Sequence, residues 1–262
     1  MDLGIAGRWA LVCGASQGLG RSCADALAAE GVNLVVNARR VDPLESAVAA
    51  LRERHPNIEI RAVAGDIALP AVQERALGAA PHLDILITNA GGPPPGDFRA
   101  WTREDWLSAL DANMLTPIAL IKACVDDMAG RGFGRIINIT SGAVKAPIDI
   151  LGLSNGARSG LTGFAAGLAR QPQLAANNVT LNNLLPGAFD TDRLSKTISA
   201  SAASSGLSAE AVRAARANGI PARRFGSPSE FGAFCAFLCS SHAGYLTGQN
   251  ILLDGGAYPG VH

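Results

Sequence analysis

Short apolar runs alternate with stretches of helical periodicity along almost the whole chain of 262 residues. This alternation is typical of a parallel sheet, because parallel neighbours are joined by long crossover connections that are usually helical. No linker or shift in composition divides the chain. The sequence therefore predicts a single α/β domain with helices on both faces of a doubly wound sheet. The expected strands cover 9–13, 32–38, 59–64, 83–88, 134–139, 179–184 and 251–253, and the expected helices cover 21–30, 43–54, 71–79, 102–128, 154–174 and 229–240.

Two of the longer helical stretches contain a proline. Pro117 is expected to kink the 102–128 stretch or to mark a break between two helices, and Pro172 interrupts the end of the 154–174 stretch. Residues 188–228 are rich in Ala, Ser and Gly, and we interpret them as a mobile, partly helical insertion. Ligands of such sheets bind outside the carboxyl ends of the strands. This rule places the functional edge at 14–20, 38–40, 65–67, 89–96, 141–150 and 186–220.

The turn after the first strand is rich in glycine, with Gly14, Gly18 and Gly20 in the pattern G-x3-G-x-G. Glycine allows a tight turn and a close approach of the backbone to a pyrophosphate, and the following helix N-terminus favours an anion. The spacing differs from the common G-x-G-x-x-G, and a glycine-rich turn without any ligand is the alternative. Its position between the first strand and the first helix favours a dinucleotide site.

Two arginines, Arg39 and Arg40, follow the second strand, where an acidic residue would bind a ribose hydroxyl pair. Ala38 cannot do so, whereas arginine pairs well with a 2′-phosphate. This favours NADP(H) over NAD(H), and two solvated arginines are the alternative. Asp66, after the third strand, is a candidate for the adenine amino group or for a helix N-cap. Asn89, after the fourth strand, is expected either beside the cofactor or bonded to the local backbone.

These residues, together with others along the chain, resemble the short-chain dehydrogenase/reductase family, and most of all its 3-oxoacyl-acyl-carrier-protein reductase-like members. The resemblance covers essentially the whole chain. It rests on Gly14-Ala15-Ser16-Gln17-Gly18-Leu19-Gly20, Asn89-Ala90-Gly91, Asn113, Ser141, Pro186-Gly187, Leu246-Thr247-Gly248-Gln249 and Asp254-Gly255-Gly256.

The resemblance implies a Rossmann-like, seven-stranded parallel sheet, binding of NAD(P)(H), and dimers or tetramers built on the helices near 105–130 and 154–174. It also implies a substrate lid over 188–220, and it places Thr191 near the nicotinamide carboxamide or the phosphates. The implied cofactor-binding residues are Gly14, Ser16, Gln17, Gly18, Leu19, Gly20, Arg39, Arg40, Asp66, Ile67, Asn89, Ala90, Gly91, Arg158, Pro186, Gly187 and Thr191.

The chain departs from the family at its catalytic tetrad of Asn, Ser, Tyr and Lys. Asn113 and Ser141 match, but Ser154 stands at the tyrosine position and Arg158 at the lysine position. An aliphatic hydroxyl is a much weaker acid than a phenol, so Ser154 is a poor proton donor. Arg158 keeps the positive charge but does not release a proton at any useful pH. The segment thus keeps the electrostatics of the family and lacks its acid.

Lys145 is a candidate replacement for that acid. It lies four residues after Ser141, on the loop that leaves the fifth strand. An ammonium group becomes a useful acid when desolvation and a neighbouring cation ease the loss of its proton. Its surroundings, Val144-Lys145-Ala146-Pro147, also resemble a sequence motif that reductase-like proteins with an imperfect tetrad tend to carry. The alternative is a solvated loop lysine.

Three functions remain open on these grounds. The first is an NADP(H)-dependent oxidoreductase of a carbonyl or alcohol substrate, with Asn113, Ser141, Lys145, Ser154 and Arg158 as the candidate catalytic residues. The second is a weakly active or inactive cofactor-binding protein, serving as a sensor or partner subunit. The third is a non-redox reaction on the same scaffold. The substrate class, small or carried on an acyl carrier, is not indicated, although Arg193, Lys196, Arg213 and Arg216 in the lid either meet an acidic substrate or form a solvated face.

Composition narrows the partners. With 22 basic and 22 acidic residues, the chain has no bulk attraction for nucleic acid or an anionic membrane. No apolar run reaches membrane-spanning length without a break, and the start lacks an export signal. Five cysteines without a CxxC pair favour a reducing, cytoplasmic setting, and the four scattered histidines suggest no metal site.

Overall fold

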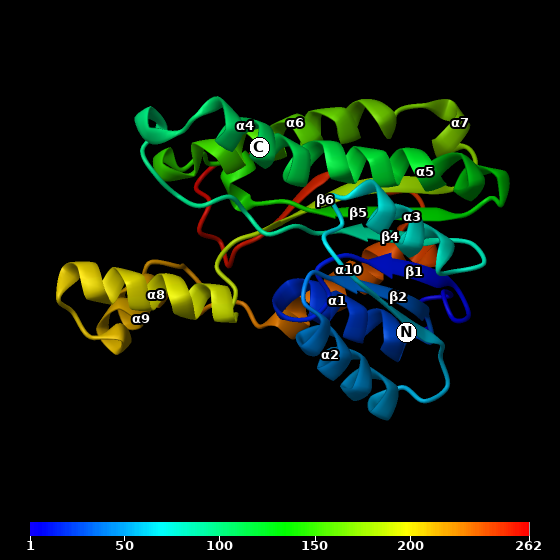
Figure 1. The fold of residues 1–262 in the computed structure, drawn as a ribbon, viewed down its shortest axis with the longest axis horizontal. Helices are drawn as coiled ribbons and strands as arrows, with labels where there is room; N and C mark the ends of the chain where they lie inside the picture. The colour runs from blue at the N-terminus through cyan, green and yellow to red at the C-terminus, as the bar shows by residue number, and fades with distance from the viewer. Residues whose placement is uncertain (262) are drawn as a thin grey trace.

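The computed structural model describes residues 1–261, and its centre is a seven-stranded, all-parallel sheet (Figure 1). The strand order is β3-β2-β1-β4-β5-β6-β7, with the order reversing between β1 and β4. This confirms the expected doubly wound α/β fold and its seven strands. The strands are β1 (Trp9–Val12), β2 (Asn33–Ala38), β3 (Ile60–Ala64), β4 (Ile85–Thr88), β5 (Gly134–Ile139), β6 (Val179–Pro186) and β7 (Asn250–Leu253).

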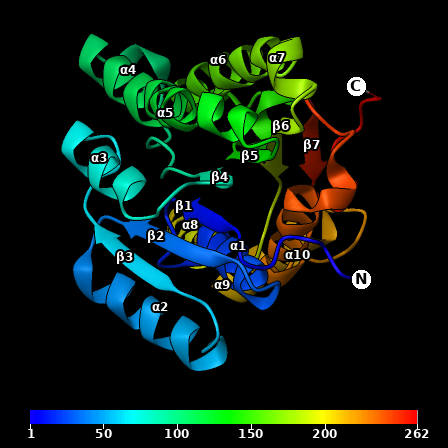
Figure 2. The same ribbon diagram turned by 90° about the vertical axis from the view of Figure 1, so that its right-hand side faces the viewer.

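Helices cover both faces of the sheet (Figure 2). One face carries α1 (Gly18–Ala29), α2 (Val41–Arg54) and α10 (Pro228–Cys239), and the other carries α3 (Pro70–Gly78), α4 (Arg103–Leu110), α5 (Thr116–Gly130), α6 (Gly152–Leu168) and α7 (Pro172–Ala175). Each face has its own apolar cluster, one built on α1 and α10 and the other on α5 and α6. Because both faces are covered, the central strands are buried along their whole length, which explains their continuous apolar sequences.

A row of polar side chains crosses the buried part of the sheet. Thr88 Oγ1 donates to Asn138 Oδ1 at 2.7 Å, Asn138 Nδ2 donates to Asn183 Oδ1 at 2.9 Å, and Asn183 Nδ2 donates to Asn250 Oδ1 at 2.8 Å. The same residues are register partners in β4, β5, β6 and β7. A shift of one residue in any of these pairings would leave buried amides without partners, so the row fixes the register.

Arg135, in β5, is fully buried although its surroundings contain no carboxylate partner among the described residues. Its guanidinium donates to the carbonyls of Ser240, Gly134 and Asn178 and to the Asn178 side chain, at 2.7–3.0 Å. It also lies over the Phe133 ring. Burial lowers the pKa of this guanidinium to about 10, so it stays charged at neutral pH and ties the start of β5 to α10 and β6.

The helical run 103–130 is continuous, where the sequence suggested a kink or break at Pro117. A π-helical turn over Asp111–Leu115 joins α4 to α5, and Pro117 lies in the first turn of α5, where a missing N–H is tolerated. By length and composition this run is apolar enough to cross a membrane, and 44% of its most apolar window is buried inside the protein. Leu120, Cys124 and Met128, which belong to this run, pack in the apolar core between the run and the sheet.

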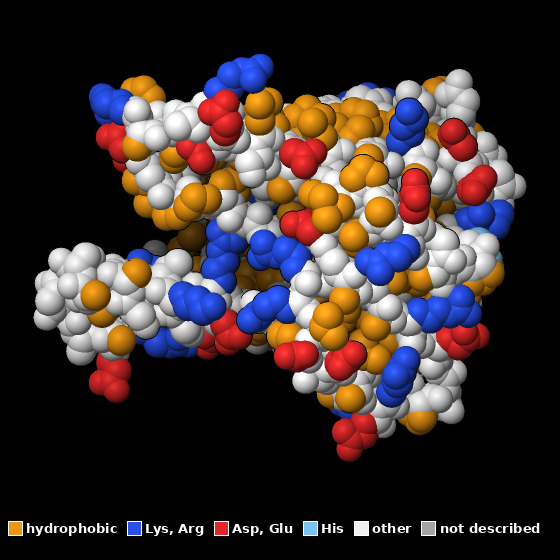
Figure 3. Space-filling view, viewed as in Figure 1, with side chains coloured by type: hydrophobic (Ala, Val, Ile, Leu, Met, Phe, Trp, Pro, Cys, Tyr) orange, Lys and Arg blue, Asp and Glu red, His pale blue; other side chains and the backbone are white. Residues whose placement is uncertain are grey.

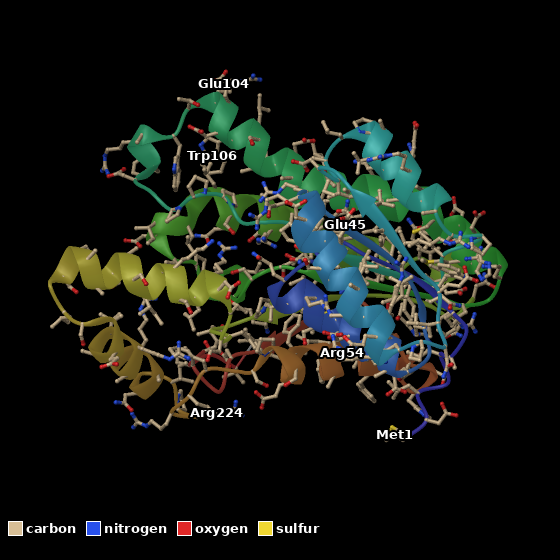
Figure 4. All side chains as sticks on the ribbon, turned by 60° about the horizontal axis from the view of Figure 1, so that its bottom comes forward. Met1, Glu45, Arg54, Glu104, Trp106 and Arg224 are labelled. Atoms are coloured by element: carbon tan, nitrogen blue, oxygen red, sulfur yellow. The ribbon has the colours of Figure 1, made fainter. Side chains whose placement is uncertain are left out.

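The segment expected to be a lid contains two helices, α8 (Asp192–Ser205) and α9 (Ala209–Asn218), and is therefore more regular than the partly helical insertion that the composition suggested. The two helices project from the body of the protein (Figure 1) and share a small apolar cluster of their own, which contains Ile198 and Val212. Arg224, labelled in Figure 4, lies in the segment that leads back to α10. Its guanidinium pairs with the Glu230 carboxylate at 2.6 Å.

Most other boundaries lie within three residues of expectation; α1, for example, begins at Gly18 and β4 at Ile85, where residues 21 and 83 were expected. The expected 154–174 helix is divided, with α6 ending at Leu168 and the short α7 beginning at Pro172. Strand β6 continues to Pro186, two residues beyond the expected end, so its last residue pairs with Leu253.

Candidate active site

A cleft of about 680 Å³, here called the long cleft, runs along the carboxyl ends of β1, β2 and β4. Gly14 and Gly18 have φ values of +64° and +60°, which side-chain-bearing residues rarely adopt. A Cβ atom at Gly20 would lie 2.4 Å from the Gly14 carbonyl oxygen, so only glycine lets α1 begin this close to β1. The first turn of α1 has neither a side-chain cap nor an acidic residue, which leaves its N–H groups available to an anion.

Arg39 and Arg40 line the long cleft at the end of β2, and both are exposed. Among residues 1–261 neither makes an ion pair with an acidic side chain. The Arg39 guanidinium reaches across the cleft to within 3.8 Å of the place where Gly91 would carry a Cβ atom. Basic side chains gather visibly around the hollow (Figure 3). The free charges at this position fit a cofactor that carries a 2′-phosphate.

Asp66 and Ile67 line the same cleft after β3. The Asp66 carboxylate accepts from Ala68 N at 3.1 Å, so it orders the turn before α3, although the N-cap of that helix is Leu69. Asn89 lies under the glycine turn, with Nδ2 2.6 Å from the place of a Cβ at Gly14. The other predicted residues along this cleft are Ser16, Gln17, Leu19, Ala90, Gly91 and Thr191.

A second hollow of about 270 Å³, here called the inner cavity, adjoins the long cleft between the end of β5, the start of α6 and the lid. It brings together Ser141, Ser154 and Arg158 from the predicted catalytic set, with Pro186, Gly187 and Thr191 from the predicted cofactor set. Asn89, Ala90, Leu19, Thr191 and Arg193 line both hollows, so a ligand in the long cleft would extend into the inner cavity.

Arg158 is buried in the wall of the inner cavity. Nη1 donates to the Ile139 carbonyl at 2.8 Å and Nη2 to the Ala90 carbonyl at 3.2 Å, so the side chain is held to β5 and to the loop after β4. Burial and, to a lesser extent, the charge of Arg193 lower the pKa of the Arg158 guanidinium to about 10. It remains a cation at neutral pH, and its other N–H groups remain available to a ligand.

The two serines supply hydroxyl groups to the same cavity. Ser141 Oγ accepts from Ala143 N at 3.1 Å and caps the turn over Gly142–Val144. Ser154 is buried in the first turn of α6, and its hydroxyl has no hydrogen-bond partner among the described residues. Neither is an acid of useful strength, but both can donate a hydrogen bond to a substrate oxygen.

Asn113 lies in the π-helical turn and lines neither hollow. Its Nδ2 donates to the Ala109 carbonyl at 3.2 Å, and its buried Oδ1 has no partner among residues 1–261. The structure thus places Asn113 apart from the three residues that line the inner cavity, although its neighbour Ala112 lines the long cleft.

Lys145 is half-buried on the loop after Ser141. Its Nζ lies 6.0 Å from the centroid of the Tyr258 ring. Tyr258 is in the segment after β7, where its backbone N–H donates to Asp254 Oδ2. Lys145 is not among the described residues that line the inner cavity. To reach a substrate there, its side chain would have to turn away from the ring.

Several residues of the site were not named as site residues from the sequence, although Gly92 and Asp192 lie within the predicted functional edge at 89–96 and 186–220. Asn37, Gly92, Ala112 and Asp192 line the long cleft, and Gly92 also lines the inner cavity. The Gly91-Gly92 pair after a strand was a usable signal for Gly92. Ala112 carries no such signal. Arg193 was considered only as one of four basic lid residues, and it lines both hollows.

Comparison with known proteins agrees with this geometry. Residues 14–258 match the family model described as Enoyl-(Acyl carrier protein) reductase. The chain belongs to the short-chain dehydrogenase/reductase family. Within this family the prediction of a Rossmann-like single domain is confirmed.

Among its relatives, the NADPH-dependent reductase BacG of Bacillus subtilis is 32% identical over 258 residues, which cover 97% of this chain and 99% of BacG. The 3-oxoacyl-[acyl-carrier-protein] reductase FabG of Escherichia coli is 30% identical over 96% of this chain and 98% of FabG. The L-sorbose reductase of Gluconobacter frateurii, solved with NADPH and L-sorbose, superimposes with a TM-score of 0.93 over the full length of both chains, at 29% identity. The expected preference for NADP(H) agrees with these relatives.

Proposed function

We propose that this member of the family reduces the carbonyl group of a small or carrier-bound substrate to an alcohol, with NADPH as its cofactor. The observation that carries the proposal is the continuity of the two hollows. The long cleft has the glycine turn, the open helix N-terminus and the free arginines that a dinucleotide phosphate requires, and it leads directly to Arg158 and two serine hydroxyls. Relatives described as NADPH-dependent support the choice of cofactor.

NADPH, when bound, supplies the hydride for the carbonyl carbon. The residues of the inner cavity then have to hold the carbonyl oxygen and stabilise the negative charge that develops on it. Ser141 and Ser154 donate hydrogen bonds to this oxygen, and the Arg158 guanidinium stabilises the charge at short range in a largely buried setting. Asn113, in the π-helical turn between α4 and α5, acts as a positioning residue.

A proton must still reach the oxygen. Lys145 turns from the Tyr258 ring towards the cavity, gives one proton from its ammonium group and is left as the neutral amine, which solvent protonates again. A lysine side chain has four rotatable bonds, and the loop that carries Lys145 begins at Ser141, in the cavity wall.

The proton donor can be tested with a pair of variants. Lys145→Met is expected to lower kcat by about 100-fold with the Kd for NADPH unchanged, because a general acid accelerates such steps by at least this factor. Tyr258→Phe is the matched control, since it keeps the ring beside Lys145. Full activity in Lys145→Met, or an equal loss in Tyr258→Phe, would remove the role given to Lys145.

The cofactor preference gives a second test. The double variant Arg39→Gln/Arg40→Gln is expected to raise the Kd for NADPH by about tenfold or more, because it removes charge-assisted bonds to the 2′-phosphate. The Kd for NADH, which lacks that phosphate, should change by less than about twofold. Fluorescence titration measures both constants. An equal change for the two cofactors would contradict the assignment of these arginines.

We further propose that the chain works in the cytoplasm as a dimer or tetramer that uses α4, α5 and α6. Leu107 and Leu115 are both about half exposed on the 103–130 helical run. Analytical ultracentrifugation measures the assembly state, and a monomer at micromolar concentration would contradict the proposal.

A further inference from the structure

The inner cavity is positively charged and contains no acidic side chain among the described residues that line it. Arg158 is in its wall, and Arg193, from the second residue of α8, faces it from the lid. The other basic lid residues contact groups outside the inner cavity or face solvent. Arg213 pairs with Asp190, Arg216 Nη1 donates to Thr197 Oγ1 at 3.2 Å, and Lys196 is exposed and lines neither hollow.

The protein backbone makes room for the Arg193 guanidinium. A Cβ atom at Gly92 would lie 2.7 Å from Arg193 Nη2 and 3.0 Å from Nη1, so this guanidinium lies directly against a residue without a side chain. Arg193 thereby spans from the lid to the loop after β4. Among residues 1–261 it has no hydrogen-bond or ion-pair partner.

We propose that the substrate carries a carboxylate near its carbonyl group, and that Arg193 is the residue that binds this carboxylate. The inference rests on the proposed function, whose substrate class it specifies. Two guanidinium groups that face one cavity repel each other, and an anion between them turns this repulsion into attraction. Arg158 stabilises the negative charge that develops on the carbonyl oxygen, and the Arg193 charge is then available to a second, permanently anionic group.

The diphosphate of the cofactor is the other anion within reach, because Arg193 also lines the long cleft. The cleft already offers the diphosphate the glycine turn and the uncapped N-terminus of α1, a helix of 12 residues without an acidic first turn. Among the described residues that line the inner cavity, only Arg193 and Arg158 offer a substrate carboxylate a positive charge. This difference assigns Arg193 to the substrate.

The test uses the full chain loaded with NADP⁺, so that ketones bind without turnover. Isothermal titration compares 2-oxohexanoate, 4-oxohexanoate and 5-oxohexanoate, each with its primary amide, which has nearly the same shape and no charge. We expect at least one acid to bind about tenfold or more tightly than its amide, because hydrogen bonds between charged groups contribute this much. The advantage should shrink as salt is added.

Three variants locate the effect. Arg193→Gln should abolish the difference between acid and amide while the Kd for NADPH changes by less than about threefold, and Arg193→Lys should keep part of the difference. Gly92→Ala, which displaces the guanidinium and leaves its charge, should reduce the difference as well. Lys196→Gln, on the same helix but away from both hollows, is the matched control and should leave every constant unchanged.

Two results would overturn the proposal. One is that none of the three acids binds more tightly than its amide, including the case in which none binds. The other is that Arg193→Gln weakens NADPH by tenfold or more without an acid-specific effect, which would assign Arg193 to the cofactor diphosphate. Neither result depends on turnover. Failure of the proposed reductase function would appear separately, as an absence of NADPH oxidation with any carbonyl compound, charged or neutral.

Discussion

Replacing Arg158 with methionine is expected to lower kcat for carbonyl reduction by about 100- to 1000-fold, the range found when a charge-stabilising donor is removed from an active site. Arg158 is the only cation in the described wall of the inner cavity that is also buried, and burial strengthens its action on a developing negative charge. Because the pKa of its guanidinium is about 10, it is charged at every pH between 5 and about 9, and the loss should be nearly independent of pH in that range.

Two measurements separate a catalytic loss from misfolding. Far-ultraviolet circular dichroism should stay close to that of the unaltered protein, and the Kd for NADPH should change by much less than kcat, since most residues of the long cleft are untouched. Arg158→Lys restores a charge at this position and should recover part of the activity. If Arg158→Met kept activity within about threefold, charge stabilisation would have to come from another residue.

Arg135→Met is expected to lower the free energy of unfolding by about 4 kcal/mol, because it removes four buried hydrogen bonds at about 1 kcal/mol each. Their acceptors are the carbonyls of Gly134, Asn178 and Ser240 and the Asn178 side-chain oxygen. Methionine fills a similar volume, so the loss reports mainly the missing hydrogen bonds. Urea denaturation followed by circular dichroism measures the change.

Arg99→Met is the matched control for this stability measurement. Arg99 is largely exposed and pairs only with the nearby Asp97 carboxylate and the Phe98 ring, so its replacement should alter the free energy of unfolding by less than about 1 kcal/mol. Equal losses in the two variants would mean that the buried network around Arg135 contributes little to stability.

The sequence was sufficient for the fold because the relevant signals are local. Gly14 and Gly18 have left-handed backbone, and Gly20 lets a helix begin close to a strand. Both requirements arise within one short turn, so the local sequence indicates them. Strand β5 was predicted to the residue, since it is buried on both faces and ends at a turn. The π-helical turn before Pro117 could not be predicted, because it depends on how α4 and α5 pack against α6.

The candidate site was only partly predictable, because side-chain direction on loops depends on tertiary contacts. Ser141 and Arg158 could be expected in one cavity from the carboxyl-end rule. Lys145 could not be placed, since its contact with Tyr258 joins residues that are far apart in sequence. The same applies to the lid, where Arg213 and Arg193 look alike in sequence, yet one pairs with Asp190 and the other faces a cavity.

The buried polar row across β4, β5, β6 and β7 also limits how this chain can change over evolution. The Asn138 and Asn183 amides have a fixed orientation, because the Nδ2 of each donates towards β7 and the Oδ1 of each accepts from the side of β4. A single apolar replacement, such as Asn138→Leu, leaves the Thr88 hydroxyl without its acceptor and the Asn183 Oδ1 without its donor. A second replacement at Asn183 then removes the Oδ1 atom that the first replacement had left without a donor. Substitutions in the row are therefore strongly epistatic, and the four positions are expected to drift together or not at all.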